Sequence, residues 1–62
     1  MIDLFTNDEV RRAIGQSHDY ILDNIITPEV MDRIRVATMQ DNDRRYMAYR
    51  LEYFANFARK GA

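Results

Sequence analysis

The sequence predicts an all-α protein, a small helical hairpin or three-helix arrangement that dimerisation completes as a bundle. Apolar residues recur at spacings of three and four, which is the period of a helix with one buried side. Signals that start a helix are frequent, whereas strand signals are nearly absent. A chain of 62 residues makes at most one domain, so we expect residues 1–62 to form a single helical domain.

The first helix is predicted over residues 7–26. Thr6 and Glu9 have the spacing of a capping box, in which each side chain binds the backbone amide of the other residue. Phe5 and Val10 fall at the two positions of a hydrophobic staple. The helix that follows carries one apolar stripe, made of Val10, Ile14, Ile21, Leu22 and Ile25. We expect this helix to serve as scaffold.

Two further helices are predicted over residues 28–40 and 44–60. Thr27 is the expected N-cap of the second, and Pro28 occupies its first position, where the missing amide costs nothing. Asp41, Asn42 and Asp43 have poor helix propensity, so they either cap a new helix or lie on the exposed side of a continuous one. The sequence leaves both alternatives open.

The predicted C-terminal helix is unusually rich in aromatic residues, because five of the seven in the chain lie between Tyr46 and Phe57. Its apolar arc is far wider than the stripe of an ordinary surface helix. One row, Met47, Leu51 and Phe54, is assigned to the core of the chain. A neighbouring row is predicted to be a contact strip between chains, since tyrosine and arginine are enriched at interface hot spots. That strip consists of Tyr46, Arg50, Tyr53 and Phe57.

Each strip residue also has an alternative interpretation. The aromatic side chains can be ordinary core, and Arg50 can form a salt bridge to an acid of the first helix. Its aromatic neighbours three and four positions away also make cation-π stacking geometrically available.

The sequence provides no support for catalysis. There are no cysteines and only one histidine, so a structural zinc site has too few ligands. The single serine, Ser17, has no glycine elbow around it, and two glycines cannot form a phosphate-binding loop. We therefore predict no catalytic, cofactor-binding or metal-binding residues. His18 lies on the predicted apolar stripe and is a candidate pH-sensitive residue, because burial and nearby acids shift histidine titration.

A homodimer is expected for two reasons. For a chain this small, apolar burial and the cost of ordering the chain are of similar size, and here neither disulfides nor a metal add stability. The charges are also divided along the chain. Residues 1–32 carry seven acids against two arginines, and residues 33–62 carry seven bases against three acids. The two halves therefore have opposite net charges and attract one another, within one chain or between copies.

These observations predict a non-catalytic interaction module, a dimeric helical adaptor or inhibitor that binds a larger protein through its aromatic and arginine-rich C-terminal helix. The alternative is a small helix-turn-helix-like DNA-binding regulator, with Arg44 and Arg45 at the start of the recognition helix. No signal-peptide pattern or membrane-spanning run is present, so we expect a cytoplasmic protein with no membrane partner.

Overall fold

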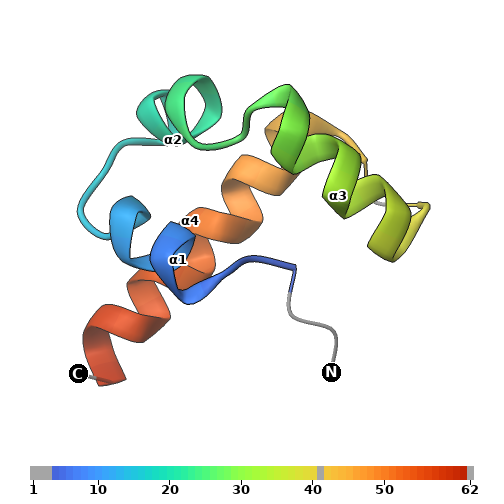
Figure 1. Ribbon diagram of the computed structural model, residues 1–62. Coiled ribbons are helices and arrows are strands. Elements are labelled where there is room, and N and C mark those ends of the chain that lie inside the picture. Colours follow the sequence, from blue (N-terminus) through green and yellow to red (C-terminus); the bar gives the residue numbers. More distant parts are fainter. Residues whose placement is uncertain (1–3, 41, 62) are drawn as a thin grey trace.

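The computed structural model describes residues 4–40 and 42–61, which contain four helices and no strand. The helices are α1 (Asn7–Ala13), α2 (His18–Asn24), α3 (Pro28–Thr38) and α4 (Arg44–Gly61). The all-helical fold is therefore confirmed. The longest helix, α4, runs through the molecule, and α1 and α2 both pack against it (Figure 1).

The prediction of one helix over residues 7–26 is wrong. The chain leaves α1 after Ala13 and begins α2 at His18. Gly15 has a φ of 78°, in the left-handed region that glycine adopts without strain, and this turns the chain out of the helix. Ser17 then caps α2, because its hydroxyl accepts the Tyr20 amide at 3.1 Å. The described residues consequently form four helices instead of the two or three expected.

The other predicted helix starts are confirmed. The capping box is complete, with the Glu9 amide donating to the Thr6 hydroxyl at 3.1 Å and the Thr6 amide donating to the Glu9 carboxylate at 3.0 Å. Thr27 caps α3, and Pro28 is its first residue. These local signals were sufficient because capping depends only on residues within one helical turn.

The open question between one long C-terminal helix and two is settled in favour of two. Met39 has a φ of 61°, which a helix cannot continue through. Asp43 then caps α4, since its Oδ1 atom accepts the Arg45 amide at 2.8 Å and the Tyr46 amide at 3.2 Å. Asp41 lies outside the described residues.

The core lies between α4 and the three preceding helices. From α4 it takes Met47, Ala48, Leu51 and Ala55, each at most 1% exposed. The rest of the chain supplies Leu4, Phe5, Ala13, Ile21, Ile25, Ile26, Met31 and Ile34, with Val10, Ile14, Leu22, Val30 and Phe54 packed around them. A single copy buries these side chains, so the dimer stays a prediction.

Two arginines join the helices across the core. The guanidinium of Arg33 on α3 donates to both carboxylate oxygens of Glu9 on α1, at 3.0 and 2.7 Å, and to the Leu4 carbonyl at 3.1 Å. The guanidinium of Arg44, the first residue of α4, donates to the carbonyls of Leu22 and Ile26 at 2.8 and 3.1 Å. Arg44 therefore satisfies a carbonyl that the end of α2 leaves free, and Arg33 satisfies a carbonyl of the segment before α1.

Truncation of Leu51 tests the core. Its side chain is fully buried, so Leu51→Ala should lower the free energy of unfolding by about 2 to 5 kcal/mol through lost burial and the cavity left behind. Urea denaturation followed by circular dichroism measures this loss. An unchanged midpoint would mean that the α4 core row is assigned incorrectly.

The capping carboxylate predicts a dependence of stability on pH. Burial by itself raises the pKa of Glu9, but the hydrogen bonds from Arg33 and Thr6, together with the Arg33 charge, outweigh it and hold the pKa below its ordinary value of 4.5. The folded chain therefore binds this proton less readily than the unfolded chain. Glu9 stabilises the fold above pH 4.5, and that contribution is lost as the pH falls through the lower folded pKa.

Glu9→Gln should accordingly flatten the acid branch of a plot of unfolding free energy against pH. Glu29→Gln is the control, because it removes the charge of an exposed carboxylate on α3 and should keep the parental slope. Equal slopes for the parent and Glu9→Gln would show that this ion pair does not govern the acid response.

Candidate interaction surface on α4

The side of α4 opposite the core carries a set of exposed aromatic side chains. Tyr46, Tyr49, Tyr53 and Phe57 are 48%, 56%, 67% and 70% exposed. Arg50 lies among them and is half-buried. The four residues of the predicted contact strip are thus brought together on one side of a single helix. We call Tyr46, Tyr49, Arg50, Tyr53 and Phe57 the aromatic face.

A recess of about 280 Å³ lies in the middle of this surface, lined by Tyr49, Arg50, Tyr53 and Phe54. Its lining comes from two adjacent rows of side chains four residues apart, Tyr49 with Tyr53 and Arg50 with Phe54. The groove between two such rows is the feature into which a second helix inserts its own ridge of side chains. The recess therefore has the geometry of a helix-docking groove.

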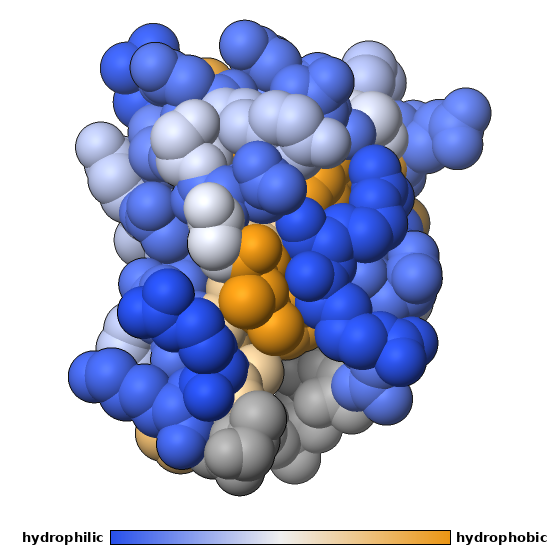
Figure 2. Space-filling model, turned by 90° about the vertical axis from the view of Figure 1, so that its left-hand side faces the viewer, coloured by the Kyte–Doolittle hydropathy of each residue, from blue (hydrophilic) through white to orange (hydrophobic). Residues whose placement is uncertain are grey.

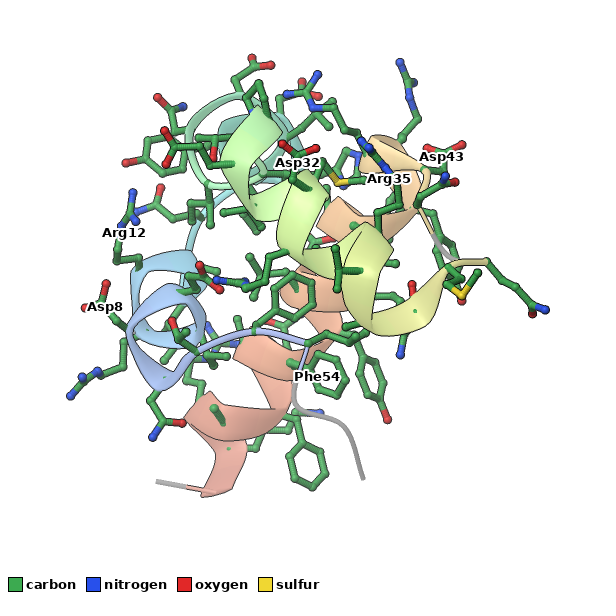
Figure 3. The ribbon with its side chains drawn as sticks, turned by 45° about the vertical axis from the view of Figure 1, so that its right-hand side comes forward. Asp8, Arg12, Asp32, Arg35, Asp43 and Phe54 are labelled. Atoms are coloured by element: carbon green, nitrogen blue, oxygen red, sulfur yellow. The ribbon has the colours of Figure 1, made fainter. Side chains whose placement is uncertain are left out.

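Contacts from the N-terminal half hold both edges of the recess. The His18 ring stacks on Tyr49, with centroids 3.7 Å apart and planes 22° apart. At the other edge, Phe54 meets Phe5 edge to face at 6.1 Å, and Figure 3 shows Phe54 beside the chain segment that leads into α1. Phe54 also makes an edge contact with Tyr53 at 5.9 Å. The walls of the recess are thus positioned by the folded core.

Arg50 makes the predicted cation-π contact. Its guanidinium carbon lies 5.7 Å from the centroid of the Tyr46 ring, one helical turn away. This contact holds the arginine along the aromatic face, and a side chain that is already positioned loses less freedom when it binds a partner.

His18 is placed differently from its prediction. It is the first residue of α2 instead of a residue inside one long helix. Both ring nitrogens are buried and have no hydrogen-bond partner among residues 4–40 and 42–61. The structure thus assigns His18 a packing contact at the edge of the aromatic face. Its sensitivity to pH stays a prediction.

The sequence prediction missed two residues of the site. Tyr49 was not assigned to the contact strip, although it forms a row with Tyr53 and Phe57 at spacings of four that the sequence shows. Phe54 was assigned to the core, yet it both packs on the core and lines the recess. Spacing alone did not reveal this double role, because Phe54 lies at the boundary between the buried side and the exposed side of α4.

Most of the charged residues of α4 are basic. The helix carries five basic residues, Arg44, Arg45, Arg50, Arg59 and Lys60, and one acid, Glu52. Lys60 follows Tyr53 by seven residues and so lies on the same side of the helix. Glu52 is adjacent to Tyr53 in sequence and lies about 100° away around the helix. Glu52 also follows Tyr49 by three residues and is therefore a neighbour of the aromatic face.

Other parts of the described chain show fewer features of a site. The side of the molecule in Figure 2 is mainly hydrophilic, with a hydrophobic area near its centre. Within residues 4–40 and 42–61, no three histidine, cysteine or acidic side chains are grouped as metal ligands would be. None of the helices in the described ranges combines the length and the apolar character that a membrane crossing requires.

Comparison of the chain with family models, curated proteins and solved structures finds no match. The function must therefore be argued from the residues of the aromatic face.

Substitutions on this face should leave the fold intact. At protein concentrations low enough for the chain to be monomeric, Tyr53→Ala and Phe57→Ala should change the free energy of unfolding by no more than about 0.5 kcal/mol, because both side chains are largely exposed. Urea denaturation alongside Leu51→Ala measures the contrast. A loss of several kcal/mol for either aromatic variant would place that residue in the core.

Proposed function

We propose that the chain is a non-catalytic cytoplasmic interaction module, a dimeric helical regulator that binds a larger protein through the aromatic face of α4. The observation that carries this proposal is the clustering of four largely exposed aromatic side chains around Arg50. Single exposed apolar residues are ordinary in proteins, but a contiguous group is typical of a binding surface.

The composition of the face supports protein binding. Tyrosine, phenylalanine and arginine supply large contact areas, and tyrosine and arginine are the residues at which binding energy concentrates. The recess offers a place for an anchoring side chain, and its rigid edges reduce the entropy lost on binding.

In this proposal a second copy uses the same face. Two α4 helices can pack the row of Tyr49, Tyr53 and Phe57 into each other's grooves, which corresponds to a crossing angle of about −50°. A two-fold axis through that contact makes the same surface serve both copies. The dimer then covers the aromatic side chains until a target protein replaces one copy.

The DNA-binding alternative has weaker support. It requires Arg44 and Arg45 to meet phosphates or bases at the start of α4. The Arg44 guanidinium instead donates to two carbonyls at the end of α2 and beyond it. The aromatic face would also lie outside the groove of a duplex. We therefore favour a protein partner.

Self-association tests the proposal. The parent protein should sediment as a dimer in the micromolar range, and its melting temperature should rise with protein concentration. Tyr53→Ala should weaken the dimer by at least about 1 to 2 kcal/mol if Tyr53 is a hot spot. Tyr20→Ala is the matched control, since Tyr20 is an exposed tyrosine on α2 and not on α4.

Two results would contradict this proposal. The first is a stable monomer with a melting temperature independent of concentration, which removes the dimer. The second is tight binding of duplex DNA that weakens steeply with salt and is unaffected by Tyr53→Ala, which would favour the DNA-binding alternative.

A further inference from the structure

At the connection between α1 and α2, the local sequence and the fold favour different conformations. Val10, Ile14 and Ile21 lie on one apolar stripe at helical spacings, which favours a single helix over residues 7–24. The chain instead leaves the helix near Gly15, whose φ is 78°, and starts the next one at His18. Where local preference and the global fold conflict in this way, two conformations of a segment differ little in free energy.

The bent form of this connection is held by local contacts. Gly15, Gln16 and Ser17 are exposed, and Figure 1 shows the chain looping outward between α1 and α2. The Gln16 amide donates to the Ala13 carbonyl at 3.1 Å. The Tyr20 amide donates to the Ser17 hydroxyl at 3.1 Å. If the two helices joined, helical hydrogen bonds would replace both of these.

The contacts that hold α1 are made to distant parts of the chain. Arg33 on α3 binds the two carboxylate oxygens of Glu9 at 3.0 and 2.7 Å. Phe5, which precedes α1 and would move with it, meets Phe54 on α4 at 6.1 Å. These partners are at least 24 positions away along the chain. A second copy can therefore supply the same partners in the same geometry.

We propose that the connection is a hinge through which two copies exchange their α1 helices. Residues 14–17 join α1 and α2 into one helix of residues 7–24, about 27 Å long at 1.5 Å per residue, and α1 leaves its own α3 and α4. It takes the equivalent position on a second copy, whose α1 is exchanged in return. The Phe5 of each copy then supports the recess at the Phe54 of the other. Pairing through the aromatic face leaves α1 in place, so this exchange goes beyond that proposal and does not rest on it.

The balance between the closed chain and the exchanged dimer is decided at the hinge. The contacts of α1 are the same in both states, so they favour neither. The states differ in the backbone of residues 14–17 and in the entropy that two copies lose on association. Glycine favours the bent form, because it adopts a positive φ without strain and has poor helix propensity. Gly15 therefore keeps the chain closed.

Substitution of Gly15 tests the hinge. A Cβ atom at this position would meet nothing within 4 Å, so alanine acts there through the backbone alone. Gly15→Ala should raise the association constant of the dimer at least about tenfold, since alanine is strained at a positive φ and both copies gain its helix propensity. Sedimentation measures the dimer, and circular dichroism should show more helix. The measurement is made with Tyr53→Ala in the same chain, which weakens pairing through the aromatic face.

Two variants of Ser17 form a matched pair, because Ser17→Ala and Ser17→Pro both remove the hydroxyl that caps α2. Ser17 has a φ of −72°, which proline also adopts in the bent form. Inside a joined helix, however, proline loses a hydrogen bond and clashes with the preceding turn. Ser17→Ala should therefore form more of the exchanged dimer than Ser17→Pro does.

A charge reversal tests whether α1 changes copies. One chain carries Glu9→Arg and a second carries Arg33→Glu, so each places like charges where α1 meets α3 in the closed form. In an exchanged dimer of the two variants, α1 of each copy meets the opposite charge on the other, and both ion pairs re-form. The mixture should therefore form a heterodimer that melts at a higher temperature than either variant alone. If the separate variants do not fold, helical signal should appear on mixing.

The ion pair between Asp32 and Arg35 provides the control. Both residues lie on α3, at 3.1 Å, so exchange of α1 cannot re-form this pair between copies. A mixture of Asp32→Arg and Arg35→Asp chains should melt as its separate components do.

Two results would overturn the exchange. One is a mixture of the Glu9 and Arg33 variants that behaves as the sum of its parts. The other is a Gly15→Ala chain that stays monomeric, with or without a larger helix signal. A heterodimer that persists with Tyr53→Ala in both chains supports the exchange whether or not the aromatic face also forms a dimer.

Discussion

The buried row of α4, formed by Met47, Ala48, Leu51 and Ala55, is the surface on which the rest of the protein is assembled. The helices α1 and α2 have seven residues each, well below the roughly 12 to 15 residues that an isolated helix needs to be even marginally stable in water. They are helical because both pack against α4 and because each has a side-chain cap. The arginines at positions 33 and 44 then join α1 to α3 and α2 to α4 through charge-assisted hydrogen bonds.

The same arrangement produces the candidate site. Because the preceding helices cover one side of α4, the side chains of its other side are exposed to solvent. His18 and Phe5, which belong to the scaffold, pack on Tyr49 and Phe54 at the two edges of the recess. Changes in the scaffold at these two contacts would therefore alter the walls of the recess directly. Tyr49 and Phe54 thus contact the scaffold and also line the recess.

The sequence by itself determined the helical class, the caps at Thr6 and Thr27, and the two rows of α4, because capping and periodicity are local and are repeated within a few turns. It did not determine the break at Gly15, since one glycine within a continuous apolar stripe costs only about 1 kcal/mol in a helix. Whether the helix continues through Gly15 or ends before it depends on how α1 and α2 each pack against α4. The stacking of His18 on Tyr49 and the pairing of Glu9 with Arg33 join residues 31 and 24 positions apart, and only the tertiary structure decides which distant residues meet. For the same reason the exposure of the aromatic face became visible only once the buried side of α4 had been identified.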